Sequence, residues 1–530
     1  MRPMASPAAV VGLSALLVGL SLLLQIDIDL NLADEGFLWY GAWRAAAGDV
    51  PLRDFQAYDP GRYYWVAALS PVVGDGIHGL RTAVAAFWVV GLTLGLLAAR
   101  RAVRSWTMLA GVGVILTLWL FPRWVFEPAL AMAAVFFATR LLERPSLDRH
   151  FAAGAFVGVA AFFGRNHALY ALLSLAVVIA VQWRGAPRAT VARRAASFAA
   201  GAALGAAPLL VMLLSMPGFA AAYAASVGEM FRLGTTNLTL PVPWPWLENY
   251  TAMPPLDALS RALYTSSFVV MPLSLAIGAF LLLRRRTPPP PMALFLAAAV
   301  VGIPYMHYAY SRADFIHFAS AIHPWLLALI AAPALAAPRR RPWAAVAVAA
   351  FVVPLSVLTV ARLSPLGSKL AAPADAYVAR DVAGEALWLP RADADFLARV
   401  EAQRLAHLDP SQGVLVAPHL PGLYRILGRP SPVTEIYFLF AATAEQQRSM
   451  ITDLEARSVT WAVLGNEPID GMDERRLAHT HDQFWRYLRD AFAPSDDGAL
   501  GRGYAVLRRV DAPPAAGRPG TAREQVATSR

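Results

Sequence analysis

Long apolar stretches recur along the first 362 residues, and short polar connections between them carry most of the charged side chains. A membrane-spanning helix needs about 20 mainly apolar residues, with roughly 17–25 tolerated. Segments of this general kind lie at 8–26, 82–99, 106–121, 127–142, 195–214, 264–283, 293–306, 320–337 and 343–361. The pattern predicts a mainly α-helical, polytopic transmembrane bundle over residues 1–362.

The stretch 151–182 is too long for a single pass. At about 1.5 Å per residue it would form a helix of about 48 Å, against a hydrocarbon core of about 30 Å. The polar run Gly164–His167 interrupts it near the middle. We therefore predict two passes that turn at 164–167, and about eleven spans in all.

Arginine placement predicts which ends of the spans face the cytoplasm. Lys369 is the only lysine, and sixteen arginines fall in five short connections between spans. These connections lie at 100–104, 140–149, 184–194, 284–286 and 339–341. Cytoplasmic loops of membrane proteins are enriched in Lys and Arg. This bias predicts a cytoplasmic amino terminus, an extracytoplasmic carboxyl terminus, and outer segments at about 27–81, 215–263 and 306–320.

Composition agrees with a membrane protein and narrows the chemistry. Apolar residues make up 57% and charged residues 15%, against about 25% charged in a typical soluble domain. The net charge of +10 is explained by the arginine-rich connections, so we expect no nucleic-acid partner. The chain has no cysteine, which excludes disulfides, a thiol nucleophile and a thiolate metal site.

The pattern changes after the last predicted span. Charged residues become frequent, and short apolar runs at 413–417, 459–464 and 504–507 alternate with helix-like stretches at 391–407, 442–457 and 473–492. This pattern predicts a small extracytoplasmic α/β domain over 370–510. The remaining residues, 511–530, are rich in Pro, Ala, Gly and Arg and are predicted to be a disordered tail.

The first outer segment, 27–81, is acidic and begins just after the first span. Asp34 and Glu35 suit general-base work or cation binding in a partly dehydrated cavity at the membrane surface. The alternative is that they stabilise the amino terminus of a helix. Asp54 and Asp59 are candidates for binding an acceptor, or else ordinary turn residues.

Two further polar sites interrupt apolar surroundings on the predicted outer side. Glu127 is either a second acid facing the cavity of Asp34 or the ion-pair partner of Arg123. Arg165 and His167 lie at the turn of the 151–182 hairpin, where an arginine at membrane depth normally has a partner or a function. A phosphate is a natural partner for the guanidinium fork, and snorkelling to headgroups is the alternative.

The last candidate cluster lies in the outer segment 306–320. Arg312 and His317 suit the binding of a phosphate or diphosphate, with Asp314 orienting one of them, and an ordinary salt bridge is the alternative. The spacing matches no metal-binding helix motif, and no phosphate-binding loop or nucleotide fingerprint is present. These features favour a lipid-linked donor over a cytosolic nucleotide sugar.

Taken with the topology, several short motifs are similar to those of the type C membrane glycosyltransferases, which include protein O-mannosyltransferases and aminoarabinose transferases. The motifs are Asp34-Glu35, Asp54-Phe55, Pro60-Gly61-Arg62-Tyr63, Gly74…Arg81, Arg123…Glu127, Gly164-Arg165-Asn166 and the carboxyl-terminal α/β domain. A lysine often found near the Gly164 position in related enzymes is an arginine here.

This resemblance implies transfer of a hexosyl or pentosyl group from a polyprenyl-phosphate donor to a glycan, lipid or protein acceptor, at the outer face of a bacterial inner membrane. Asp34, with Glu35 beside it, is the implied base, and Asp54, Asp59 and Glu127 are implied acceptor-binding residues. Arg165, His167, Arg312 and His317 are implied to hold the lipid phosphate. No cofactor is required, and the participation of a divalent cation stays open.

Three other functions use some of the same residues. A flippase or transporter of lipid-linked sugars would also need arginines for a lipid phosphate, but internal repeats and broken helices near mid-membrane would be expected. A ligase or polymerase of lipid-linked glycans suits the Arg312–His317 cluster better than the acidic loop. A non-catalytic envelope scaffold would not need Asp34 intact.

Overall fold

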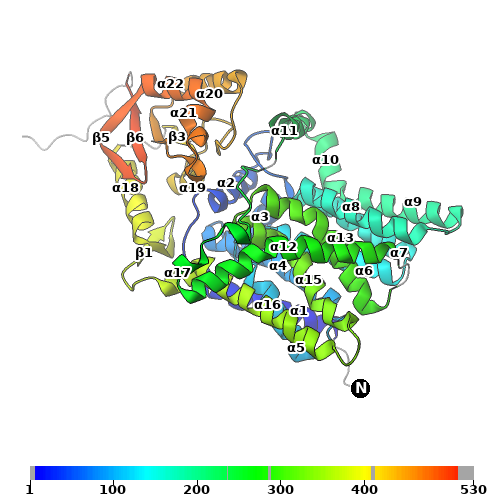
Figure 1. Cartoon of the computed structure of the whole chain (residues 1–530). Helices are drawn as coiled ribbons and strands as arrows, with labels where there is room; N and C mark the ends of the chain where they lie inside the picture. Colours follow the sequence, from blue (N-terminus) through cyan, green and yellow to red (C-terminus); the bar gives the residue numbers. More distant parts are fainter. Residues whose placement is uncertain (1–5, 236, 285–287, 408–411, 511–530) are drawn as a thin grey trace, which may run out of the picture. The chain divides into compact units, whose positions relative to one another are not determined.

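The computed structural model of the chain describes residues 6–235, 237–284, 288–407 and 412–510 (Figure 1). The chain divides into two compact units, Met1–Arg391 and the residues from Ala392 onward. This division falls later than the predicted 362–370, because a hairpin over 377–390 pairs with the first unit. The predicted tail 511–530, and Arg285 and Arg286 of the fourth arginine-rich connection, lie outside the described residues.

Every predicted span corresponds to one helix or to a bent pair of helices in the first unit. The helices are α1 (Pro7–Leu23), α4 (Ile77–Ala99), α5 (Trp106–Leu118), α6 (Glu127–Glu143), α7 (Leu147–Phe163), α8 (Arg165–Trp183), α9 (Arg188–Gly205) with α10 (Ala207–Ser215), α12 (Pro255–Leu283), α13 (Pro290–Ser311), α14 (Phe315–Ala321) with α15 (His323–Ala331), and α16 (Arg341–Leu363). The predicted break at Gly164 separates α7 from α8. The mainly helical transmembrane fold is therefore confirmed.

The number of spans stays a prediction. Within the described ranges, five helices are long and apolar enough to cross a membrane by themselves. The count rises to seven if the pair α9–α10, bent by 61°, and the pair beginning with α14, bent by 51°, each form one span. The apolar helices α1 and α5 are shorter than a usual span.

Short elements fill the predicted outer segments and the turns between spans. They are α2 (Asp34–Ala46), α3 (Gly61–Val73), α11 (Phe219–Leu233), α17 (Pro365–Ala371), and the 3₁₀ helices η1 (Pro245–Leu247), η2 (Tyr250–Ala252) and η3 (Ala332–Leu335).

The three predicted outer segments contact one another. Arg53 donates a hydrogen bond of 3.2 Å to the Pro217 carbonyl, and Val50 packs with Phe219 in one apolar cluster. Asn237 binds Ser311 at 2.8 Å. These contacts place the segments at the same end of the bundle, as the arginine pattern requires.

Arginine-rich connections also meet one another. Arg101 pairs with Glu143 at 2.9 Å, Arg149 donates to the Arg140 carbonyl at 2.6 Å, and Arg184 donates to the Leu283 carbonyl. The first connection thus meets the second, and the third meets the end of the helix that leads into the fourth, whereas the Arg149–Arg140 bond lies within the second connection. The contacts agree with the predicted grouping of ends, whereas the side of the membrane that each end faces stays a prediction.

Helices α7 and α9 pack backbone to backbone through small residues that the sequence analysis did not single out. Each carries a Gly-x₃-Gly pair, Gly154 with Gly158 on α7 and Gly201 with Gly205 on α9. A β-carbon added at Gly201 would lie 2.0 Å from the Phe151 carbonyl oxygen. Glycine pairs at this spacing permit close helix approach in membranes. This packing carries α10 and α11, which follow α9, to the end of the bundle that holds the outer segments.

The first unit ends in an antiparallel hairpin of β1 (Tyr377–Val382) and β2 (Glu385–Pro390). The second unit holds a four-stranded sheet in the order β3-β4-β6-β5, with β3 (Val414–Ala417) parallel to β4 (Trp461–Gly465). Strands β6 (Tyr504–Arg509) and β5 (Phe492–Gly501) are antiparallel to their neighbours.

Helices accompany this sheet, and the predicted small α/β domain is confirmed. They are α18 (Arg391–His407), α19 (Gly422–Leu427), α20 (Ala444–Ala456), η4 (Ile469–Gly471), η5 (Asp473–Arg475), α21 (Leu477–Thr480) and α22 (Asp482–Ala491). Leu415, Phe438, Leu454, Phe484 and Leu488 are buried in its core.

Candidate active site

The two acids that follow the first span have different surroundings. Asn31 Oδ1 accepts hydrogen bonds from the backbone N–H groups of Ala33 and Asp34, both at 2.9 Å, and so starts helix α2. The Asp34 carboxylate is half-buried, with the Asn31 side-chain amide 3.5 Å away. Glu35 is fully buried. Adjacent positions on a helix point in different directions, so the two carboxylates face different neighbours.

Glu35 lies in a buried charge network with two arginines. Arg81 binds both of its carboxylate oxygens, through Nε at 2.7 Å and Nη2 at 2.8 Å, and Arg123 Nε lies 3.6 Å away. The same arginines donate hydrogen bonds to backbone carbonyls ahead of α2. Arg81 donates to the carbonyls of Ile26 and Asp29. Arg123 donates to those of Gln25 and Ile28. The network fixes the chain between α1 and α2.

The stability of this network is expected to depend on pH. Burial raises the pKa of Glu35, but the charges of Arg81 and Arg123 outweigh it and hold the pKa below the ordinary value of 4.5. A depressed folded-state pKa adds stability above that ordinary value, and the contribution is lost as the pH falls through the folded-state pKa. We expect the thermal unfolding midpoint of the solubilised protein to fall below about pH 4.5. An equally steep fall in Glu35→Gln would contradict this assignment.

A second charge cluster lies where α3, α6 and α8 begin. Glu127, the first residue of α6, pairs with Arg62 at 2.7 Å and lies 3.7 Å from His167 Nε2. Arg62 Nε donates to the Phe163 carbonyl at 2.7 Å, and His167 Nδ1 lies 3.2 Å from the Tyr305 hydroxyl. Glu127 Oε2 is buried and has no hydrogen-bond partner among the described residues.

Tyr58 connects this cluster to Asp34. Its ring is 51% exposed, contacts Phe37 of α2 edge-on at 5.0 Å, and lies 5.5 Å from the Arg62 guanidinium carbon. Partial desolvation raises the pKa of the Tyr58 hydroxyl, the nearby Asp34 carboxylate raises it further, and Arg62 lowers it. Tyr58 therefore lies close enough to both Asp34 and Arg62 to feel their charges, and Arg62 pairs with Glu127. We call these four residues the Asp34–Glu127 site.

Asp59 and Arg165 form a clamp between the first outer segment and α8. Asp59 accepts hydrogen bonds from the backbone N–H and the Nε of Arg165, both at 2.7 Å. Arg165 Nη1 also donates to Ser226 at 2.8 Å, and the guanidinium lies 4.6 Å from the Tyr223 ring centre. These contacts fit a residue that holds α3, α8 and α11 together.

Asp54 closes a turn within its own segment. It accepts hydrogen bonds from Arg53, at 2.7 and 2.8 Å, and from the Val50 backbone N–H at 2.8 Å. The Arg53 hydrogen bonds, followed by the smaller effect of the Val50 N–H, hold the pKa of Asp54 below its usual range. This environment matches the alternative interpretation of Asp54 as a turn residue.

Arg312, Asp314 and His317 form the predicted cluster between α13 and α14. Asp314 accepts hydrogen bonds from Arg312 Nε at 2.6 Å and from the backbone N–H of His317 at 2.8 Å. His317 Nδ1 also lies 2.8 Å from the Asp314 carboxylate. The Tyr308 ring lies 5.0 Å from the His317 ring and 5.6 Å from the His167 ring, so this cluster adjoins the Asp34–Glu127 site.

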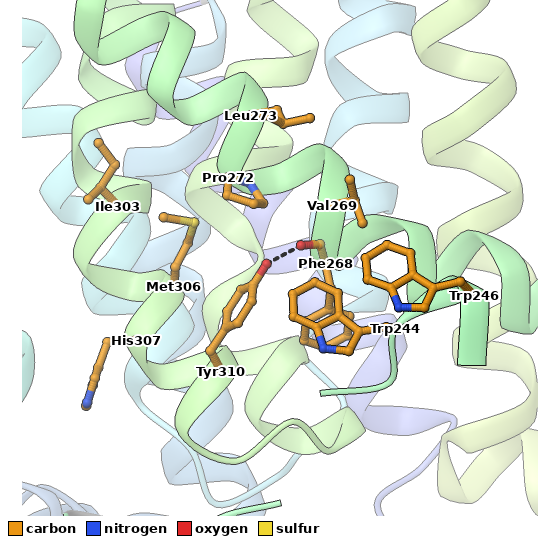
Figure 2. A pocket seen from close by; sticks show the side chains of 10 residues that line it. All are labelled: Trp244, Trp246, Phe268, Val269, Pro272, Leu273, Ile303, Met306, His307 and Tyr310. Carbon is orange, nitrogen blue, oxygen red and sulfur yellow. Dashed lines mark hydrogen bonds between the residues drawn. The ribbon is translucent and has the colours of Figure 1, made fainter. Parts of the chain in front are cut away.

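An apolar groove of about 470 Å³ lies beside these residues, between α12 and the half of α13 that leads to the Arg312–His317 cluster (Figure 2). Figure 2 shows Trp244 and Trp246 on one side and Ile303, Met306 and His307 of α13 on the other. The indole rings are stacked at 5.2 Å, and His307 Nδ1 lies 2.9 Å from the Tyr170 hydroxyl. The Tyr170 ring in turn lies 5.6 Å from the His167 ring, so Tyr170 links the groove to His167.

No role was predicted from the sequence for Tyr58, Tyr305 or Tyr308. The signal available was their spacing, since Tyr58 precedes the Asp59–Arg62 turn and the other two lie three residues apart on one helix. Residues at i and i+3 of a helix are neighbours on one face.

His323 is fully buried in the core, with Nε2 3.1 Å from the Leu116 carbonyl oxygen.

No protein-family model and no curated protein matches the chain. Two solved structures of ArnT from Cupriavidus metallidurans are similar to it. The structure bound to undecaprenyl phosphate has 16% sequence identity and a TM-score of 0.53, and the match covers 95% of this chain and 98% of that chain. The apo structure also has 16% identity, with a TM-score of 0.51 and coverage of 94% and 97%. The chain therefore has the fold of ArnT, an aminoarabinose transferase, as the resemblance to type C membrane glycosyltransferases implied.

Proposed function

We propose that the protein is a membrane glycosyltransferase that moves a sugar from a polyprenyl-phosphate donor to an acceptor hydroxyl at the outer face of a bacterial inner membrane. The observation that carries the proposal is the Asp34–Glu127 site, an acid and a tyrosine beside buried cations at the end of the bundle that holds the outer segments. The chain is similar in fold to ArnT, and one of the ArnT structures has undecaprenyl phosphate bound. This similarity supports a polyprenyl-phosphate donor.

In the proposed reaction Asp34 is the general base. It takes the proton of the acceptor hydroxyl while the acceptor oxygen attacks C1 of the sugar. The bond between C1 and the phosphate oxygen breaks, and its electron pair leaves with the polyprenyl phosphate. The half-buried position of Asp34 supports this role, because a base must be reachable by the acceptor. Direct attack of this kind inverts the configuration at C1.

The growing negative charge on the phosphate needs nearby cations. We assign this work to Arg62, Arg312 and His317. Because the phosphate is a good leaving group, we propose that a metal ion is not required, and that chelation of divalent cations leaves transfer unchanged. His167 contacts both Glu127 and Tyr305, and we assign it the orientation of Glu127.

The remaining candidate residues receive positioning roles in this proposal. Glu35 holds the arginine network that fixes the start of α2, and Asp59 with Arg165 holds α3 against α8. Asp54 stabilises its own turn. Glu127 keeps the assignment to the acceptor, since its unpartnered Oε2 is available to accept a hydrogen bond from an acceptor hydroxyl.

The groove between Trp244 and Met306 is assigned to the hydrocarbon chain of the donor. Replacement of both Trp244 and Trp246 by alanine is expected to weaken undecaprenyl phosphate binding about 10- to 100-fold, since burial of one large apolar side chain contributes about 1.5–3 kcal/mol. The measurement is a titration of the solubilised protein followed by native mass spectrometry. Trp343→Ala, at a residue that is 75% exposed on α16, is the control. If the wild type and both variants bind undecaprenyl phosphate with equal affinity, the hydrocarbon chain of the donor does not lie in this groove.

Deletion of the gene in its host tests the function without a guess about substrates. Envelope glycans and lipid-linked sugars are compared by mass spectrometry in the wild type, the deletion strain and the complemented strain. Loss of one sugar from an envelope glycan, with accumulation of its polyprenyl-phosphate precursor, is expected and would identify the donor. Accumulation of the precursor on the cytoplasmic side alone would favour a flippase.

A further inference from the structure

The β1–β2 hairpin pairs with the chain just ahead of the acidic pair. The Trp388 backbone N–H donates to the Asp27 carbonyl at 2.6 Å, and the Asp29 N–H donates to the Trp388 carbonyl at 2.8 Å. These two bonds form a parallel bridge between Ile28 and Trp388. Residues more than 350 positions apart are thereby joined a few residues before helix α2 begins at Asp34. The hairpin belongs to the first unit.

The bridge holds Asp29 in an uncommon backbone conformation. Its φ is +61°, in the left-handed region that residues other than glycine rarely adopt. The Asp29 N–H is bound by Trp388, and its carbonyl accepts a hydrogen bond from Arg81 Nη2 at 2.6 Å. Strained residues of this kind persist only where several contacts hold them. Trp388 therefore supplies one side of a clamp whose other side is the Glu35 network.

Glu385 makes a second connection, to the first turn of α4. Its carboxylate accepts the His78 backbone N–H at 2.9 Å, where an anion is favoured by the unpaired N–H groups of the helix end. A β-carbon at Gly76 would lie 2.3 Å from Glu385 Oε1, so the approach is close. Arg81, which holds Glu35, lies one turn further along α4. Lys369 Nζ also lies 4.1 Å from the Trp388 ring centre.

We propose that the β1–β2 hairpin is a positioning element of the active site, and that Glu385 and Trp388 set the placement of Asp34 through Asp29, Arg81 and Glu35. The proposal rests on the proposed function for its catalytic consequence. Its structural part, a coupling between the hairpin and the start of α2, can be measured without any activity. The hydrogen bonds of Glu385 and Trp388 lead to this site through His78, Asp29 and the Arg81–Glu35 pair.

Hydrogen–deuterium exchange of the full-length protein in detergent tests the coupling. The reporters are the amides of Asn31 and Gly36, which bond to Glu35 and to the Asn31 carbonyl rather than to the hairpin. In Glu385→Ala their exchange is expected to rise about 10-fold, as for loss of a charged hydrogen bond. Glu385→Gln retains an acceptor oxygen and should restore most of the protection. Arg380→Gln, on strand β1, is the matched control.

An increase confined to the hairpin and to residues 76–78 would overturn the proposal, whatever the protein is found to do. With the donor identified from the deletion strain, Glu385→Ala is expected to lower kcat about 10-fold with little change in KM for the donor, and Glu385→Gln to recover most of it. An unchanged kcat alongside altered exchange would remove the catalytic part. If the protein proves not to be a transferase, the exchange result still decides the coupling.

Discussion

Replacement of Asp34 by asparagine is expected to lower the rate of sugar transfer about 10²- to 10⁴-fold, the usual contribution of a general base. The side chain keeps its size and its hydrogen-bonding capacity with Asn31, but it cannot take the acceptor proton. Because Asp34 is half-buried, the folded state should lose little. The measurement is complementation of the deletion strain, with transfer followed by mass spectrometry and protein levels by immunoblot.

Glu229→Gln is the matched control for this experiment. Glu229 pairs with Arg232 three residues along α11, and both side chains are partly exposed. This variant removes a carboxylate from the outer segments without touching the Asp34–Glu127 site, so it should complement fully. Full complementation by Asp34→Asn as well would refute the assignment of Asp34 as base and shift weight towards transport or a scaffold role.

Replacement of the neighbouring acid, Glu35→Gln, is expected to act mainly on the stability of the folded protein, whereas Asp34→Asn acts mainly on the transfer rate. Glu35→Gln removes a carboxylate that pairs with two buried arginines, Arg81 and Arg123. Breaking a buried ion pair by removing one partner typically costs about 3–5 kcal/mol, because a charge is left uncompensated. Unfolding of the solubilised protein should therefore begin at a markedly lower temperature than in the wild type, whereas Asp34→Asn should unfold close to it.

A double variant tests the cause of that loss. Arg123→Gln in the Glu35→Gln background removes one of the two uncompensated charges. The combined destabilisation should then be smaller than the sum of the two single effects, which is the signature of groups in one network. Strict additivity would mean that Glu35 and Arg123 do not interact across 3.6 Å, and that the loss in Glu35→Gln has another origin.

Of the two alternatives left open for Glu127, the ion pair with Arg123 differs from the pairing in the structure. The sequence suggested Arg123 with Glu127, which are four residues apart, yet Arg123 lies with Glu35 and Glu127 pairs with Arg62. Helix α6 begins at Glu127, whereas Arg123 is in the turn before it. The two side chains therefore do not share a helix face, and each pairs with a residue from another element.

Hydropathy and charge by themselves determined where the helices of the bundle lie along the chain and which of their ends meet. Each span depends on the composition of about 20 consecutive residues, which is a local property. The break at Gly164 and the common end of the outer segments followed in the same way, from a polar interruption and from arginine placement. The alternation of short apolar runs with helix-like stretches was likewise sufficient for the α/β unit.

Only the tertiary structure separated the two acids, since Asp34 is half-buried in it and Glu35 is fully buried. Asp34 and Glu35 are adjacent and chemically alike, and no local pattern separates them. The surroundings of Glu35 depend on cations that come from distant parts of the chain, Arg81 at 46 positions from it and Arg123 further still. The pairing of Trp388 with Asp29 is more distant still. A carboxylate's chemistry is set by the charges packed around it, and those neighbours exist only once the chain has folded.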